Sequence, residues 1–200
     1  MIEEPANRNQ LSEEPSRTLQ EVEGETFFDG VSLEKIANEV GTPTYIYSAK
    51  SFDRQFRELE KAFKGVDSKI FYSVKANSNV NIISLFNQLG SGFDIVSGGE
   101  LHRVIAAGAA PQAIIFSGVG KSVSEIDLAL KAGIDCFNIE SAPELDRIIE
   151  RSRVLGKKPD ISVRINPDID ALTHPYISTG LKENKFGVDR VSALQLFKSA

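Results

Sequence analysis

One stretch of the sequence reads Ile70-Phe71-Tyr72-Ser73-Val74-Lys75-Ala76-Asn77-Ser78-Asn79. Its first five residues are apolar apart from one serine, and β-branched and aromatic side chains of this kind favour a buried strand. Lys75 follows the strand at once, and the polar turn after it is suited to begin a helix. In a β/α barrel or an open α/β sheet, ligands bind at the C-terminal ends of the strands. Lys75 is therefore a candidate Schiff-base amine, with a solvated lysine at a strand end as the alternative.

Strand-like runs recur along the rest of the chain at an even interval of 21 to 25 residues. They begin near Ile70, Phe93, Ile114, Cys136 and Ile161. The segments between them predict helices at Val80–Leu89, Glu100–Ala107, Val123–Ala132 and Ala142–Leu155. The last two of these helices begin with the capping-box patterns Ser122–Glu125 and Ser141–Glu144. Alternating strands and helices indicate an α/β fold with a parallel sheet.

The even length of these units favours a (β/α)8 TIM-type barrel over a Rossmann sheet, because no GxGxxG turn follows the first strand. The run Ser117–Ser122 lacks the first glycine of a phosphate-binding P-loop, so that motif is rejected. About five of the eight barrel strands fit before Ala200. We therefore expect the chain to be the front part of a larger protein.

Three regions are expected along the chain: a polar, disordered leader at residues 1–25, a helix-strand-helix segment at 26–64 and an incomplete barrel at 65–200. Order is expected to begin near Phe27. The middle region predicts a helix at Leu33–Val40, a strand at Thr44–Tyr47 and a second helix after Ser48. An aromatic and aliphatic stripe on this second helix is assigned to core packing. Its members are Phe52, Phe56, Leu59 and Phe63.

The composition narrows the class of protein. A hydrophobic content of 41% and a net charge of −5 are ordinary for a soluble globular protein, and the acidic balance argues against nucleic acid or an anionic membrane as partner. The single cysteine, Cys136, cannot form an internal disulfide, and the N-terminus lacks a signal peptide, so a cytoplasmic location is expected. His102 and His174 lie far apart without metal-ligand spacing, so no metal site is expected.

Polar residues near the ends of the predicted strands form the candidate site. They are Lys75, Asp94, Ser117, Asn138 with Glu140, and Arg164 with Asn166. Asp94 lies one strand from Lys75 and is suited to steady a protonated amine, or alternatively to cap a helix. Arg164 follows apolar neighbours, which favours an anionic ligand or an ion pair with Glu140. The long irregular segment Asp168–Phe186 is expected to be a lid or binding loop.

Three motifs in order resemble the barrel-type pyridoxal-phosphate amino-acid decarboxylases, whose barrel is of the alanine racemase type. The first is Phe71–Asn77, and the second is Gly92–Leu101. The third is Thr173–Gly180 followed by Lys185-Phe186-Gly187, and it is similar to the diaminopimelate decarboxylase branch in particular. The similarity extends from about Phe27 to Ala200.

This resemblance implies a pyridoxal 5'-phosphate barrel followed by a β domain, acting as a homodimer on a small amino acid. The implied reaction is the decarboxylation of meso-2,6-diaminopimelate to L-lysine and carbon dioxide, the last step of lysine biosynthesis. Lys75 would bind the cofactor covalently, and Asp94 and Arg164 would lie on its side of the pocket. His174, Tyr176 and Lys185 would belong to an active-site lid.

The family's ring-stacking imidazole, glycine-rich phosphate loop and pyridine-nitrogen partner come after the fifth strand, beyond this chain. The 200 residues alone are therefore expected to be inactive. Two alternatives remain open: a related decarboxylase of ornithine, arginine or carboxynorspermidine, and a non-catalytic cofactor-binding or interaction fragment with open sheet edges.

Overall fold

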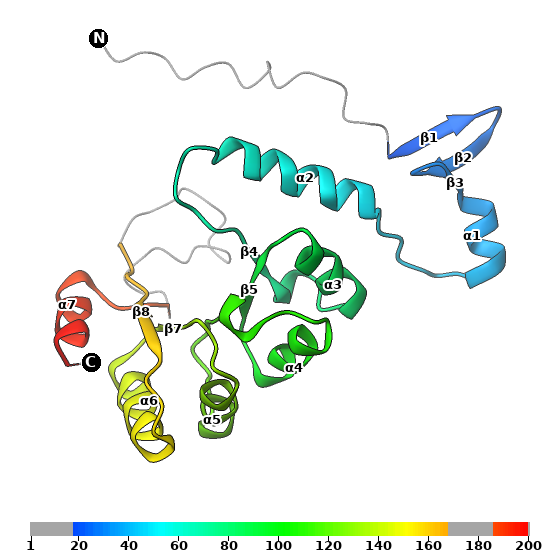
Figure 1. Ribbon diagram of the computed structural model, residues 1–200. Helices are drawn as coiled ribbons and strands as arrows, with labels where there is room; N and C mark the ends of the chain where they lie inside the picture. Colours follow the sequence, from blue (N-terminus) through cyan, green and yellow to red (C-terminus); the bar gives the residue numbers. More distant parts are fainter. Residues whose placement is uncertain (1–17, 168–185, 200) are drawn as a thin grey trace, which may run out of the picture. The chain divides into compact units, whose positions relative to one another are not determined.

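The computed structural model describes residues 18–167 and 186–199, and the chain divides into two compact units (Figure 1). Unit 1 is Met1–Ala62, and unit 2 is Phe63–Ala200. Within the described residues, none of the helices combines the length and apolar character needed to cross a membrane.

Unit 1 contains a small antiparallel sheet and two helices. The strands β1 (Leu19–Val22), β2 (Glu25–Phe28) and β3 (Val31–Ser32) pair in sequence order. Helix α1 (Leu33–Val40) begins at Ser32, whose Oγ accepts a hydrogen bond from the Lys35 amide, and helix α2 (Ala49–Ala62) begins after Ser48 in the same way. Both helices begin where the sequence predicted them, after Ser32 and after Ser48.

Regular structure begins earlier than near Phe27, so the expected leader at residues 1–25 is wrong in its last part. Glu23 and Gly24 both have positive φ, 52° and 80°, and they form a two-residue turn between β1 and β2. Such a turn matches the right-handed twist of the paired strands. A short polar segment is ordered here because it pairs with the strand that follows it.

Two further expectations for this region are corrected. Residues 44–47 are not a strand, because an extended segment needs a pairing partner and Tyr45 instead is 90% exposed. The apolar stripe is only partly core: Phe56 is buried, whereas Leu59 and Phe63 are each close to half exposed. Helical spacing predicted a common face correctly, but it did not determine what covers that face.

Unit 2 is built on five parallel strands in sequence order, which confirms the expected segment of a β/α barrel. The strands are β4 (Phe71–Ser73), β5 (Gly92–Ile95), β6 (Ile114–Phe116), β7 (Cys136–Ile139) and β8 (Asp160–Val163). The helices between them are α3 (Val80–Gln88), α4 (Gly98–Ala106), α5 (Val123–Ala132) and α6 (Ala142–Leu155), and α7 (Arg190–Ser199) follows later. Short 3-10 turns occur at η2 (Val74–Ala76) and η3 (Pro111–Ala113).

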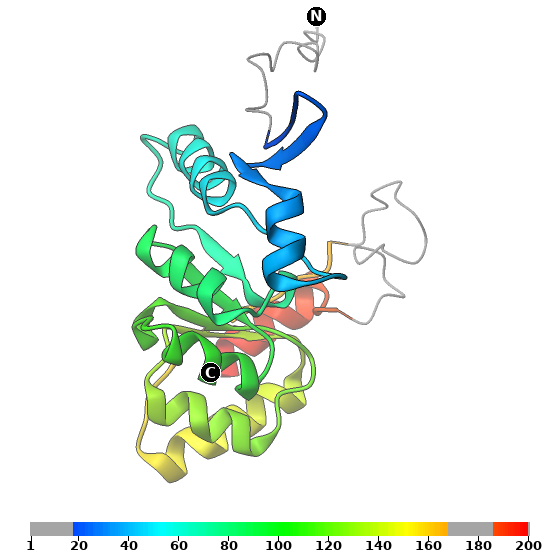
Figure 2. The same ribbon diagram turned by 90° about the vertical axis from the view of Figure 1, so that its right-hand side faces the viewer.

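The hydrophobic core lies between the sheet and helices α3 to α6, which lie on one side of it (Figure 2). Alternate strand residues such as Phe93, Phe116 and Phe137 are fully buried against these helices. Because successive side chains of a strand point to opposite faces, the residues between them point to the other face, which we call the inner face.

Glutamates in the first turn of three helices bind backbone amides at the carboxyl edge of the sheet. Glu100 accepts from the Val96 amide at 2.7 Å, and Glu125 accepts from the Gly98 amide at 2.7 Å. Glu125 also completes the predicted capping box with Ser122. These carboxylates therefore fix the loops that follow the strands, in addition to capping their own helices.

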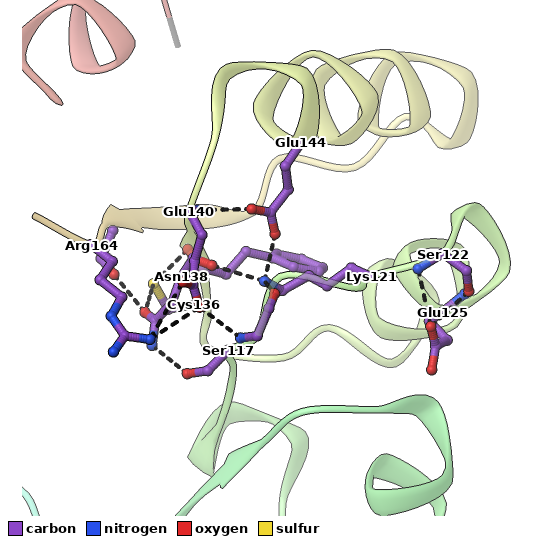
Figure 3. Close-up of polar contacts among 12 residues, drawn as sticks. Ser117, Lys121, Ser122, Glu125, Cys136, Asn138, Glu140, Glu144 and Arg164 are labelled. Carbon is purple, nitrogen blue, oxygen red and sulfur yellow. Dashed lines mark hydrogen bonds and ion pairs between the residues drawn. The ribbon is translucent and has the colours of Figure 1, made fainter. Parts of the chain in front are cut away.

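The predicted second capping box is wrong, because Ser141 makes no side-chain cap and Glu144 has other partners. One Glu144 oxygen accepts from the Glu140 amide at 2.7 Å, and the other accepts from Lys121 Nζ at 2.5 Å (Figure 3). Both side chains are almost fully buried. The attraction between a carboxylate and an ammonium group is stronger in a buried site than at the surface. This favours the pairing of Glu144 with Lys121 over a capping box with Ser141.

All three N–H groups of Lys121 are used in this arrangement. Besides Glu144, Nζ donates to the carbonyl oxygens of Gly118 and Asn138, both at 2.8 Å. The lysine that completes the rejected P-loop pattern is therefore a structural cation, which ties the loop after β6 to β7 and α6.

We predict that Lys121→Met destabilises the chain by about 3–5 kcal/mol, because it leaves the Glu144 charge buried and uncompensated. Urea unfolding of the 200-residue chain measures this loss. Lys131→Met, at an exposed lysine of α5, is the matched control and should change the free energy of unfolding by less than about 0.5 kcal/mol. Equal effects of the two substitutions would contradict a structural role for Lys121.

A second prediction concerns acid. The hydrogen bond from the Gly98 amide, followed by those from Ser122, lowers the pKa of Glu125 below its usual value. A carboxyl group with a lowered folded-state pKa adds stability above its unfolded pKa of about 4.3, and this stability is lost as pH falls through the folded pKa.

Glu125→Gln should therefore be less stable than the original chain at pH 6, and the gap should close as the pH approaches 3. Urea unfolding at a series of pH values tests this expectation, with Glu150→Gln on the exposed side of α6 as the control. A gap that is constant with pH would contradict it.

Candidate active site

Lys75 is presented at the carboxyl edge of the sheet by the turn η2, directly after β4. Val74 is fully buried in the core, whereas Lys75 next to it is exposed. Tyr72 secures the same turn, because its hydroxyl donates to the Asn77 carbonyl at 3.0 Å. Asn79 then caps α3 by accepting a hydrogen bond from the Asn81 amide. The alternation of apolar and polar residues in this motif thus anchors the turn on one side and exposes the amine on the other.

Asp94 lies on β5 at the inner face, beside the strand that carries Lys75. It is in register with Ser73, two residues before the lysine. The hydroxyl of Ser73 donates to one carboxylate oxygen at 3.3 Å, and that of Ser117 donates to the other. Both partners are hydroxyl groups, so each carboxylate oxygen of Asp94 has one hydrogen-bond donor.

Arg164 follows β8 and pairs with Glu140, which follows β7 (Figure 3). Its Nη1 lies 3.3 and 3.4 Å from the two carboxylate oxygens, and Glu140 is almost fully buried. The guanidinium carbon lies 4.9 Å from the centre of the Phe186 ring, a cation–π distance. The ion pair weighed as an alternative from the sequence is thus present, and 43% of the Arg164 side chain is still exposed.

The residue after Phe186 has to be glycine. Gly187 has a φ of 76°, and a Cβ there would lie 2.7 Å from the backbone oxygen of Arg164. The neighbouring Val188 amide donates to that same oxygen at 2.9 Å. The Phe186-Gly187 pair of the third motif therefore holds the chain against the segment that carries Arg164.

The remaining site expectations fall into two groups. His174, Tyr176 and Lys185, like most of the expected lid Asp168–Phe186, lie outside the described residues. Cys136 points to the inner face, and its burial raises the pKa of the thiol, which keeps it protonated at neutral pH. A protonated thiol is a poor nucleophile, so we assign Cys136 no chemical role.

Two residues of the inner face were missed from the sequence. Ser73 donates to Asp94, and the hydroxyl of Ser162 on β8 donates to the side-chain oxygen of Asn138. A serine inside a strand does not by itself indicate a functional role. The available signal was the position of each serine, because it lies between two apolar residues whose side chains face the core.

Comparison with known proteins identifies the family. Residues 49–200 match the model described as "Pyridoxal-dependent decarboxylase, pyridoxal binding domain". The diaminopimelate decarboxylase of Neisseria meningitidis serogroup A is 52% identical over 174 residues, which are 87% of this chain and 43% of that protein.

Solved structures agree with this match. The diaminopimelate decarboxylase of Helicobacter pylori, complexed with L-lysine, superposes with a TM-score of 0.81 at 51% identity, over 84% of this chain and 42% of that one. The lysine/ornithine decarboxylase of Vibrio vulnificus gives a TM-score of 0.67 at 20% identity, over 84% and 40%, and so supports the fold alone. The chain spans less than half of the length of these relatives. Since the family model matches most of its residues, the chain belongs to the pyridoxal-dependent decarboxylases.

Proposed function

We propose that this chain is the N-terminal part of an enzyme that decarboxylates meso-2,6-diaminopimelate to L-lysine and carbon dioxide with the aid of pyridoxal 5'-phosphate. The observation that carries the proposal is the exposed amine of Lys75 at the end of β4, in a chain about half identical to diaminopimelate decarboxylases. A relative solved with L-lysine supports an amino acid of that length as the product. Decarboxylases of other amino acids match at much lower identity, which argues against them as the closer functional class.

The described residues fit a pyridoxal group. This group carries an aldehyde, and the exposed primary amine of Lys75 is a side chain that can bind it covalently. The Asp94 carboxylate lies on the neighbouring strand, in register with Ser73, and both of its oxygens accept hydrogen bonds from hydroxyl groups. When bound, the cofactor supplies an electron sink for the electrons left by the departing carboxylate.

In this proposal each residue has a distinct task. Lys75 holds the cofactor through Nζ and later moves a proton to or from the reacting carbon. Asp94 places a fixed negative charge beside the strand that carries the lysine, which favours a protonated nitrogen there. Arg164 offers the exposed part of its guanidinium group to the anionic side of the pocket. We further propose His174, Tyr176 and Lys185 as lid residues that contact substrate.

The physiological form proposed for the complete enzyme is a homodimer in the cytoplasm. The argument is the single unpaired cysteine, which suits a reducing compartment, together with the resemblance to dimeric decarboxylases.

We predict that borohydride reduction of the complete enzyme with pyridoxal phosphate labels Lys75. Peptide mapping identifies the labelled lysine, and two others are internal controls: Lys69 is exposed but lies before β4, and Lys121 is buried. Label on either control in place of Lys75 would refute the assignment.

Carbon dioxide release from meso-diaminopimelate by the complete enzyme should be abolished by Lys75→Ala and should stay within about twofold of the original in Lys69→Ala.

The 200-residue chain with added pyridoxal phosphate should release no more carbon dioxide than its own Lys75→Ala variant. Turnover by the chain above that background would show that the family's later residues are dispensable.

A further inference from the structure

A continuous row of hydrogen bonds crosses the inner face of the five-stranded sheet. Each strand, or the residue directly after it, contributes one member of this row, which we call the polar belt. Its members are Ser73, Asp94, Ser117, Asn138 and Ser162. The inner face therefore carries a connected network on the same strands that bury Phe93, Phe116 and Phe137 on the other side.

The contacts of the belt link neighbours in strand order. Asn138 Nδ2 donates to Ser117 Oγ at 2.8 Å, and Ser117 Oγ contacts Asp94 Oδ1 (Figure 3 shows Ser117 and Asn138). Ser162 Oγ contacts Asn138 Oδ1, and Ser73 Oγ lies 3.3 Å from Asp94 Oδ2. The thiol of Cys136 lies 4.0 Å from Asn138 Oδ1.

The charge of Asp94 determines the direction of every hydrogen in this row. An ionised carboxylate only accepts, so Ser117 has to give its single hydrogen to Asp94. The Ser117 oxygen is then left as an acceptor, and only the amide nitrogen of Asn138 can donate to it. The Asn138 oxygen in turn is left to accept from Ser162. Reversing the amide would place two acceptors against each other and would cost the hydrogen bond to the charge.

We propose that Ser117 and Asn138 are positioning residues of the proposed decarboxylase, which orient the Asp94 carboxylate for its role beside Lys75. This inference rests on the proposed function. Ser73, two residues before Lys75, connects the same carboxylate to the strand that presents the amine. The donors of Ser117 and Ser73 therefore meet at Asp94 from its two sides, one from each neighbouring strand.

The belt itself is tested first without cofactor, by NMR of the 200-residue chain. The side-chain amide protons of Asn138 should exchange at least about tenfold more slowly than those of exposed Asn38 on α1, because one of them is bound to Ser117. In Ser117→Ala the protection should disappear. Exchange of Asn138 as fast as that of Asn38 in the original chain would overturn the belt.

The functional role is tested in the complete enzyme with two near-isosteric changes. Ser117→Ala removes the donor to Asp94, and Asn138→Asp replaces the donor to Ser117 by an acceptor while retaining the contact with Ser162. Both should lower kcat for diaminopimelate about tenfold, the effect of one hydrogen bond to a charged group, with KM within about twofold. Ser117→Thr restores the hydroxyl and should recover at least half of the kcat.

Ser68→Ala is the matched control, because it removes an exposed hydroxyl that lies outside the belt and should change kcat by less than about twofold. Original kcat in Ser117→Ala and Asn138→Asp would overturn the positioning role, and so would a kcat loss in Ser68→Ala equal to theirs. Absence of label on Lys75 in the original enzyme would refute the proposed function itself, and the positioning role with it, whereas the NMR result would still stand.

Discussion

Each strand of unit 2 meets two environments at once, because successive side chains point to opposite faces of the sheet. The face toward α3–α6 is filled by large apolar residues such as Phe93 and Phe137, whose burial drives the unit to fold. The inner face bears Asp94 and Asn138 at the intervening positions. A register shift of one residue would place the polar groups in the core, so the apolar face determines the geometry of the polar one.

The loops at the carboxyl edge are held by charge as well as by packing. Glu100, Glu125 and Glu144 each bind a backbone amide beyond the usual cap, and Lys121 adds a buried cation to this set. Most of these partners are backbone groups, which carry no sequence information. Side-chain patterns alone therefore could not predict them, although the helix starts themselves could be predicted.

The parts that sequence reasoning predicted correctly are those governed by local periodicity. The five strands and helices α3–α6 lie where the spacing of apolar runs predicted them, and Lys75 follows β4 as expected. The errors concern partners that are distant in the chain. Thr44–Tyr47 has strand composition but pairs with no strand in the described part of the chain. Glu144 was expected to form a capping box with Ser141 but binds Lys121 from another loop. Ser162 was missed, because its partner Asn138 lies on the neighbouring strand and 24 residues away in the chain.

The contacts around Arg164 fix both ends of the segment between Asn166 and Phe186. The Asn166 amide donates to the Val188 carbonyl at 2.8 Å, and its side-chain nitrogen lies 3.3 Å from the Phe186 carbonyl. A connection whose ends are already joined adds little to the cost of folding as it lengthens, about 0.6 kcal/mol for each doubling of a flexible loop. The number of residues between Asn166 and Phe186 can therefore change at little cost in folding free energy, while the sheet and the position of Arg164 are left unchanged.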